Sequence, residues 1–345
     1  MNEDTRAILC SPRLERIQAY GLRRLEAVYQ GQTPPQPMQL CGLAGAGQCS
    51  MYDQPELWMD QALADLAAKA EAEKVADKAE GDPAGPFRPL TVDPWPYGVH
   101  FVDKLLGATV YEIEPGNWQA KTLSQPVGQL APPDLDSHPA WQATRRLALA
   151  FVAADVSVPF YGVPVLSSAL NIGLNLYGQE LLVAMMIDPA AARRDLRIIN
   201  DVIRQLHRWY LETIPAGRLQ MVETVGRVQP GGYGQICGCS CQLLSPELYE
   251  EFIAALDDEV MSLHPAGAGL IHLCGTHTQH IACWRGLKSF KAFQLNDRAA
   301  EDFATYFARL RDDQVFYVSP TTTMTPERIL SISGGKRVVL PSWSV

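Results

Sequence analysis

A short buried strand is predicted for Leu270-Ile271-His272-Leu273-Cys274, and it is followed by Gly275-Thr276-His277-Thr278-Gln279-His280. The apolar run ends in a glycine turn and leads into a helix, which is the strand-turn-helix unit of an α/β fold. His272 and Cys274 are two residues apart, so on a strand their side chains point to the same face. A neutral imidazole and a thiolate that converge on one spot form half of a zinc site.

Strand and helix patterns alternate from about residue 37 to the end of the sequence. This order predicts a parallel sheet, and about eight strand candidates predict a closed (β/α)8 barrel as the simplest architecture. A doubly wound open sheet is the alternative, but no dinucleotide-binding glycine fingerprint supports it. We expect residues 1–36 to form an N-terminal helical extension and residues 37–345 to form the barrel domain. The predicted strands are Met38 to Leu43, Phe87 to Val92, Val158 to Val165, Arg218 to Val225, Leu270 to Cys274, Lys291 to Leu295, Val315 to Val318 and Arg337 to Leu340.

The formal net charge of the 345-residue chain is -9, and its lysines and arginines form no block. This charge disfavours nucleic acid and anionic membranes as partners. No secretory signal pattern follows Met1, and no run of about 18 apolar residues predicts a transmembrane helix. A cytoplasmic protein is therefore expected. Its eight cysteines then indicate reduced thiols, metal ligands or catalysis rather than a disulfide framework.

A second cysteine-rich stretch, Cys237-Gly238-Cys239-Ser240-Cys241, closes a glycine-rich loop that is predicted from Val228 to Ile236. Three cysteines at alternate positions can share a face and bind a metal, so any one of Cys237, Cys239 and Cys241 is a candidate ligand. The stretch lacks the C-x-x-C spacing of a zinc knuckle, and cysteines without a metal are the alternative. For His272 and Cys274 the alternative is a hydrogen-bonded core histidine beside a small buried hydrophobic residue.

Three polar residues near predicted strands are candidates for contact with a substrate. Asp93 follows the strand Phe87 to Val92, at a position where a barrel mouth carries groups that bind or protonate a substrate. The alternative for Asp93 is the capping of a turn before a proline. Ser167 and Ser168 stand at a predicted helix start, where they either bind an anion or cap the helix.

Three stretches of the chain match one known family. They are Val163-Pro164-Val165-Leu166-Ser167-Ser168-Ala169 with the later Tyr177-Gly178 and Asp188-Pro189, Leu244-Ser245-Pro246-Glu247-Leu248-Tyr249-Glu250-Glu251-Phe252, and Ile271-His272-Leu273-Cys274-Gly275. Together they resemble the uroporphyrinogen decarboxylase superfamily, and in particular its zinc-dependent, corrinoid-linked methyltransferases of the methylcobamide:coenzyme M type. The resemblance covers nearly the whole chain from about residue 11.

This resemblance implies that His272 and Cys274 are zinc ligands. The methyltransferases of the family take a third ligand from a cysteine after the last strand, whereas this chain reads Pro341-Ser342-Trp343-Ser344-Val345 there. Related cobalamin-independent methionine synthases use a glutamate on the strand after H-x-C, and near that place stand Asn296 and Asp297. The candidates for a replacement ligand are therefore Asp297, Cys239, Cys241, His277 and His280, and Asn296 is a candidate substrate-binding residue. For His277 and His280 the simpler alternative is a position on a helix surface, or beside the ligands without contact to the metal.

The function that the resemblance implies is the transfer of a methyl group from a corrinoid protein, or a similar donor, to a thiol that zinc holds as a thiolate. The corrinoid is expected on a partner protein, because the chain has no D-x-H-x-x-G cobalamin-binding motif. A homodimer is implied as well.

Two other functions are alternatives to methyl transfer. One is a lyase that uses Asp93 as an acid on a carboxylate or a tetrapyrrole. The place of the decarboxylase's arginine-rich signature reads Cys41-Gly42-Leu43-Ala44-Gly45-Ala46-Gly47, which has no arginine and disfavours decarboxylation of a polycarboxylate. The other alternative is a non-catalytic protein that binds a metal or a tetrapyrrole.

Overall fold

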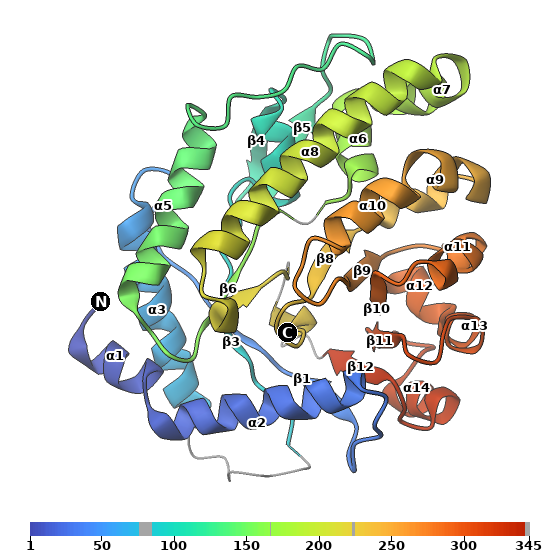
Figure 1. Ribbon diagram of the computed structural model, residues 1–345. Coiled ribbons are helices and arrows are strands. Elements are labelled where there is room, and N and C mark those ends of the chain that lie inside the picture. The colour runs from blue at the N-terminus through green and yellow to red at the C-terminus, as the bar shows by residue number, and fades with distance from the viewer. Residues whose placement is uncertain (76–84, 166, 223–224, 342–345) are drawn as a thin grey trace.

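The computed structural model describes residues 1–75, 85–165, 167–222 and 225–341. Strands lie in the middle of the molecule, and helices surround them (Figure 1). The protein therefore has an α/β fold, as the alternation of strand and helix patterns predicts.

Two parallel sheets contain most of the strands. The larger sheet has six strands in the spatial order β1 (Met38–Leu40), β12 (Val338–Pro341), β11 (Val315–Val318), β10 (Phe290–Leu295), β9 (Gly269–Leu273) and β8 (Gly234–Cys237). The smaller sheet has four strands in the order β2 (Leu43–Gly45), β3 (Leu90–Val92), β6 (Phe160–Gly162) and β7 (Leu219–Gln220). Every pairing inside these two sheets is parallel.

The expected closed (β/α)8 barrel is not seen as one continuous sheet within the described ranges. Isolated parallel bridges lie between the two sheets instead. Leu40 of β1 pairs with Phe87, which precedes β3, and Ser167, which follows β6, pairs with Cys237 of β8. The sequence predicts a strand from Arg218 to Val225, but β7 has only two residues, and residues 223–224 lie outside the described part of the chain. A strand this short offers few backbone groups for a ladder with β8.

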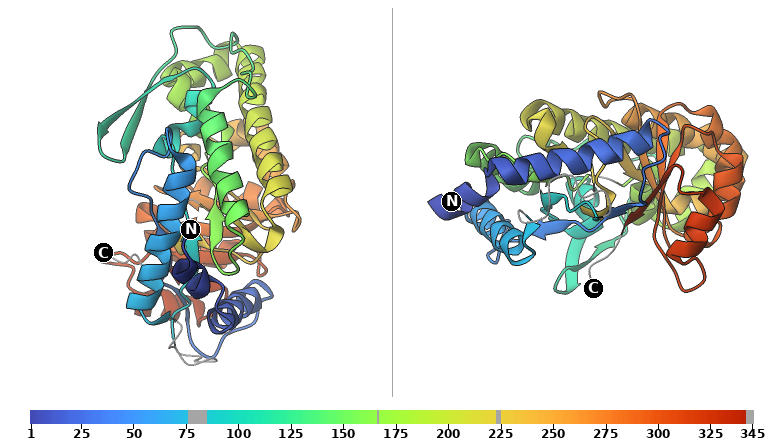
Figure 2. Two further views of the ribbon diagram at one scale, coloured as in Figure 1. Left: turned by 90° about the vertical axis from the view of Figure 1, so that its left-hand side faces the viewer. Right: turned by 90° about the horizontal axis from the view of Figure 1, so that it is seen from below.

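Two helices precede the first strand, and the other α-helices lie between strands in chain order. The helices α1 (Glu3–Leu9) and α2 (Pro12–Tyr29) come before β1, and a two-stranded hairpin of β4 (Thr109–Glu114) and β5 (Asn117–Lys121) projects from the body (Figure 2). The remaining α-helices are α3 (Pro55–Ala72), α4 (Phe101–Leu105), α5 (Pro139–Ala154), α6 (Ala169–Tyr177), α7 (Gln179–Ile187), α8 (Pro189–Thr213), α9 (Pro246–Phe252), α10 (Ala254–Met261), α11 (Ile281–Gly286), α12 (Asp297–Glu301), α13 (Phe303–Arg309) and α14 (Pro326–Ser333). Short 3₁₀ helices are η2 (Gly98–His100), η3 (Ala216–Arg218), η4 (Val225–Arg227), η5 (Cys239–Leu243) and η6 (Thr278–His280).

No single helix in the described ranges has both the length and the apolar character that are needed to cross a bilayer. The pair α6 and α7 reaches that length and character only together, and the two helices are bent by 106° at their junction.

The side chains of the larger sheet alternate between two cores. On β9, Ile271 and Leu273 belong to the main core, whereas Leu270 belongs to a second cluster that includes Tyr29 of α2. The hydroxyl of Tyr29 lies 3.2 Å from the hydroxyl of Tyr317 on β11, so α2 packs against the inner face of the sheet. Phe160 of β6, Leu270 of β9 and Val315 of β11, which belong to this inner cluster, are the first or second residues of their strands. The inner face near their carboxyl ends is left for polar side chains, the usual position of sites in α/β folds.

One strand lies where the sequence predicts a loop. The glycine-rich range Val228 to Ile236 is expected to be a loop, but β8 begins at Gly234. A Cβ atom on Gly269 would lie only 2.4 Å from the carbonyl oxygen of Gly234, so glycine lets β8 and β9 approach closely at this pair. The glycine pattern that resembles a loop is therefore the start of a strand.

Candidate metal centre

Three polar side chains form one row across three neighbouring strands. Cys237 of β8 pairs with His272 of β9, and His272 pairs with Gln294 of β10. Register partners in a sheet project to the same face. Their chain neighbours Ile236 and Ile271 belong to the main core on the opposite face, so the row lies on the inner face near the carboxyl ends of the strands.

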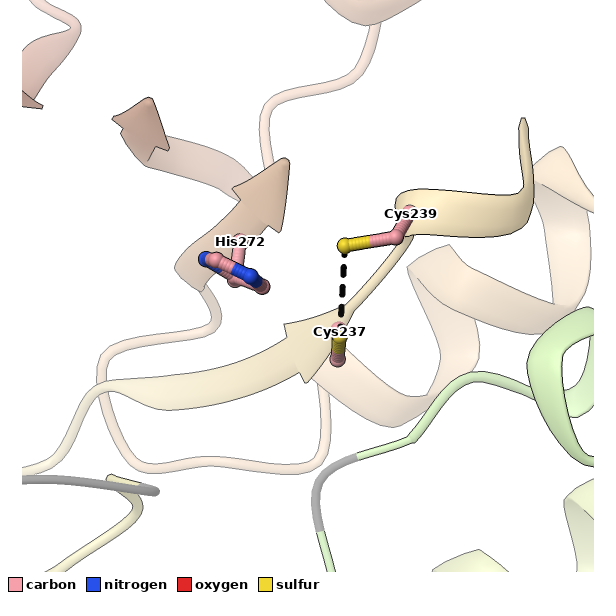
Figure 3. A group of neighbouring side chains, drawn as sticks. All are labelled: Cys237, Cys239 and His272. Carbon is pink, nitrogen blue, oxygen red and sulfur yellow. Dashed lines mark hydrogen bonds between the residues drawn. The ribbon is translucent and has the colours of Figure 1, made fainter. Parts of the chain in front are cut away.

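Cys237, Cys239 and His272 form a group of candidate metal ligands. Their ligand atoms all lie within 4.8 Å of one another, and Figure 3 shows the two thiols and the imidazole facing a common space. The two Sγ atoms are 3.7 Å apart, which is too far for a disulfide bond. Two thiolates bound tetrahedrally to one zinc ion lie about 3.8 Å apart, because each Zn–S bond is about 2.3 Å. The sulfur spacing therefore fits zinc.

Cys274 provides a third sulfur, and so a fourth candidate ligand, beside this group. Its Sγ lies 3.1 Å from Nε2 of His272, and its backbone N–H donates to Sγ of Cys239 at 3.3 Å. The chain thus brings together the histidine and the cysteine of H-x-C with two cysteines of the other cysteine-rich stretch. Two thiolates and one imidazole leave one position of a zinc tetrahedron open, whereas binding of Cys274 as well would close it.

Gln294 determines which nitrogen of His272 can bind a metal. The side-chain N–H groups of Gln294 donate to Oδ1 of Asn296 and, at 3.0 Å, to Oγ of Ser319, so its Oε1 faces His272. Nδ1 of His272 therefore carries the proton and donates to Gln294. Nε2 faces the cysteines, and it offers a lone pair to a metal whenever the ring is neutral. Such a hydrogen bond to the other ring nitrogen is typical of metal-binding histidines.

The thiols and the imidazole shift one another's protonation. Hydrogen bonds from Cys239 and then from His272 lower the pKa of Cys274 to about 5, against the effect of burial. The pKa of Cys239 is raised because its thiol donates to the neighbouring sulfurs. Burial works against protonation of His272, but the negative charges of nearby thiolates outweigh burial and raise its pKa. A metal ion has to displace these protons, so its affinity should increase with pH.

The three cysteines of C-x-C-x-C do not share one face. Strand β8 ends at Cys237, and the chain then enters η5 at Cys239, so the alternation of a strand no longer applies. Cys241 is fully buried in the main core, and burial raises the pKa of its thiol. It is not a member of the metal-ligand group. Cys237 is a member, although it was not among the replacement ligands that follow from the resemblance. Recognition of a strand at 234–237 would have placed it next to His272.

The two residues after β10 lie at the edge of the group. Asn296 accepts from the side chain of Gln294, and its backbone N–H donates to the carbonyl of Leu273 at 2.9 Å. Asp297 begins α12 with φ of 48° and lies near enough to Cys274 for its charge to raise the pKa of that thiol. Neither belongs to the metal-ligand group.

Asp93 and the two serines lie on the other sheet or at its border. Asp93 directly follows β3 and sits beside Gly162 of β6, where a Cβ atom would lie 2.3 Å from Oδ1 of Asp93. Ser168 caps α6 by accepting from the backbone N–H of Asn171 at 3.3 Å, which explains its position by capping. Ser167 bridges to Cys237, so it lies next to the metal-ligand group.

His277 and His280 are both fully buried and make hydrogen bonds to the cysteine segments. Nε2 of His277 donates to the carbonyl of Cys274, and Nε2 of His280 donates to the carbonyl of Cys241 at 2.8 Å. Burial lowers the pKa of both side chains, that of His277 to about 4, so both are neutral at pH 7. Neither histidine belongs to the metal-ligand group.

No family model matches the chain, and a search of curated proteins finds no similar sequence. Among solved structures, a methyltransferase from Methanosarcina mazei is similar, with a TM-score of 0.61 and 14% sequence identity over 93% of this chain and 92% of that chain. At this identity the similarity shows a shared fold over nearly the whole length of both chains.

Proposed function

We propose that this protein is a zinc-dependent methyltransferase that moves a methyl group from a corrinoid protein, or a similar donor, to a thiol. The observation that carries the proposal is the group of Cys237, Cys239 and His272 at the carboxyl ends of β8 and β9. The fold that the chain shares with the methyltransferase from Methanosarcina mazei supports it. The sequence resemblance to corrinoid-linked methyltransferases supports the choice of donor and acceptor.

The residues of the group would have distinct roles. Cys237 and Cys239 would supply thiolates, and His272 would supply Nε2 because Gln294 holds its Nδ1 proton. Bound zinc would keep a substrate thiol deprotonated and nucleophilic at neutral pH. Asp93, Ser167 and Asn296 are our candidates for contact with the substrate. Of these, Ser167 pairs with Cys237, and Asn296 accepts from Gln294, the partner of His272.

We also propose that the two sheets are parts of one (β/α)8-type barrel. The bridges at Leu40 and Ser167 support this, because they join β1 and β8, the two edge strands of the larger sheet, to the segments that precede β3 and follow β6 of the smaller sheet. The inner face of such a barrel would hold the second hydrophobic cluster, which includes Tyr29 of α2, at one end. It would hold the metal-ligand group at the other end.

The test is metal analysis of protein purified without added zinc, followed by an assay of thiol methylation with methylcobalamin as donor and a panel of small thiols as acceptors. We expect about one zinc ion per chain, its loss in His272→Ala and in Cys239→Ala, and a loss of thiol methylation in the same variants. Failure of the wild type to bind zinc even after zinc is added would overturn the proposal.

A second function, a non-catalytic metal-binding protein, is favoured by Cys274. Its Sγ is close enough to His272 to act as a fourth ligand, and four protein ligands are typical of closed, structural zinc sites. The cobalt(II)-substituted protein separates the two functions. A change in its visible absorption on addition of a thiol indicates an open position, and an unchanged spectrum together with no methylation of any thiol favours the structural site.

A further inference from the structure

Two segments far apart in the sequence carry the candidate ligands, and several hydrogen bonds join them. The backbone N–H of Gly238 donates to the carbonyl of His272 at 2.9 Å, and the backbone N–H of Cys274 donates to Sγ of Cys239 at 3.3 Å. The spacing between the ligands therefore depends on how the segment 237–241 is held against the segment 272–274.

His277 and His280 each donate a hydrogen bond to one of these segments. Nε2 of His280 donates to the carbonyl of Cys241 in the first segment, at 2.8 Å. Nε2 of His277 donates to the carbonyl of Cys274 in the second. Because a carbonyl only accepts, each imidazole carries its proton on Nε2. The stretch 277–280 thus connects the two cysteine-bearing segments through one hydrogen bond to each.

The rings of both histidines are fixed by aromatic neighbours. His280 lies 4.7 Å from the ring of Tyr249 and 5.5 Å from that of Trp284, and His277 lies 6.2 Å from Trp284. The backbone N–H of His277 also donates to the hydroxyl of Tyr306 at 3.1 Å. Both side chains are fully buried, so little freedom remains for either donor to turn away from its carbonyl.

We propose that His277 and His280 are positioning residues of the metal centre, which hold the carbonyls of Cys274 and Cys241 and so set the spacing of the ligands before a metal binds. This inference rests on the metal centre of the proposed function. It does not depend on which thiol or methyl donor the protein uses. Hydrogen bonds that orient ligands in this way typically contribute about 10- to 100-fold to metal affinity.

The test compares glutamine and methionine at each position, because these side chains are similar in length and glutamine alone has an N–H donor. Zinc affinity is measured by competition with a chromophoric chelator for the wild type, His280→Gln, His280→Met, His277→Gln and His277→Met. We expect the methionine variants to bind zinc at least ~10-fold more weakly than the wild type and the glutamine variants to recover most of the affinity. Equal affinity in the methionine and glutamine variants overturns the inference.

His264→Met is the matched control. His264 is buried and hydrogen-bonds to His207 at 3.1 Å, but it lies beside Gly234, at the opposite end of β8 from Cys237. We expect this variant to lose thermal stability without losing zinc affinity, and a loss of affinity equal to that of His280→Met counts against a positioning role. If a methionine variant does not fold, the phenylalanine variant replaces it in the same comparison. A wild type that binds no zinc overturns the proposed function together with this inference, whereas unchanged affinity in the variants overturns this inference alone.

Discussion

Cys237 and His272 are register partners in the parallel pair of β8 and β9, so the thiol and the imidazole leave the sheet side by side on its inner face. The two residues are far apart in the sequence. The pairing turns two short sequence motifs, C-x-C and H-x-C, into one group of ligands.

The first prediction distinguishes the roles of Cys239 and Cys241 in zinc binding. Cys239→Ala should reduce bound zinc from about one ion per chain to nearly none, because Sγ of Cys239 belongs to the metal-ligand group. Cys241→Ala should keep the zinc, because the thiol of Cys241 is buried in the main core. Metal analysis after dialysis against a mild chelator measures both. Loss of zinc in Cys241→Ala with retention in Cys239→Ala would show that the wrong cysteine has been assigned.

The second prediction concerns the hydrogen bond from His272 to Gln294. Gln294→Leu removes the acceptor that holds the proton on Nδ1, so zinc affinity should fall by about 10- to 100-fold. Gln294→Glu keeps an acceptor at the same place and should retain the affinity. Chelator competition measures both variants, and urea unfolding of each shows whether the fold is intact. Wild-type affinity in Gln294→Leu would contradict the role of Gln294.

The third prediction concerns the glycine turn after Cys274. Gly275 has φ of +79°, and a Cβ atom there would lie 2.1 Å from Oε1 of Gln242. Gly267 also has a positive φ, of +62°, but a Cβ atom there would meet none of the described residues within 4 Å beyond its chain neighbours. Both alanine variants should lose about 1 kcal/mol for the left-handed backbone. Gly275→Ala should lose about 1 kcal/mol more, because Gln242 has to move. Urea unfolding measures the difference, and equal losses would contradict the steric argument.

The fourth prediction concerns stability in mild acid. Burial lowers the pKa of His207 to about 4 and that of His264 to about 3, from 6.5 in an unfolded chain. Between pH 6.5 and 4 the unfolded chain therefore binds protons that the folded protein does not, and the free energy of unfolding falls as the pH falls. His264→Gln removes one such group, so its stability loss between pH 7 and pH 5 should be smaller than that of the wild type by about 2 kcal/mol.

Denaturant unfolding at both pH values measures this difference. The buried carboxyl of Asp257 works in the opposite direction, because burial raises its pKa to about 7 and the folded protein holds its proton better than the unfolded chain. Asp257 is present in the wild type and in the variant, so its effect cancels in the comparison. An identical pH dependence for the two proteins would mean that His264 becomes protonated in the folded state.

Local sequence patterns determined the fold class, one helix cap and the nearness of His272 to Cys274. The alternation of strand and helix patterns predicted an α/β fold, and the serine before α6 predicted the cap that Ser168 forms, because periodicity and capping depend on residues within a few positions. The spacing of His272 and Cys274 likewise placed an imidazole and a thiol close together, since alternate residues of a strand share a face.

Only the tertiary structure decided which residues lie beside His272 and Cys274. The register of β8, β9 and β10 brings Cys237 and Gln294 to either side of His272, and that register is set by the packing of strands that are distant in sequence. The end of β8 at Cys237 turns Cys241 into the core and leaves Cys239 at the site. Whether the sheet closes also depends on long-range pairing, so the strand count alone did not foresee two sheets joined by isolated bridges.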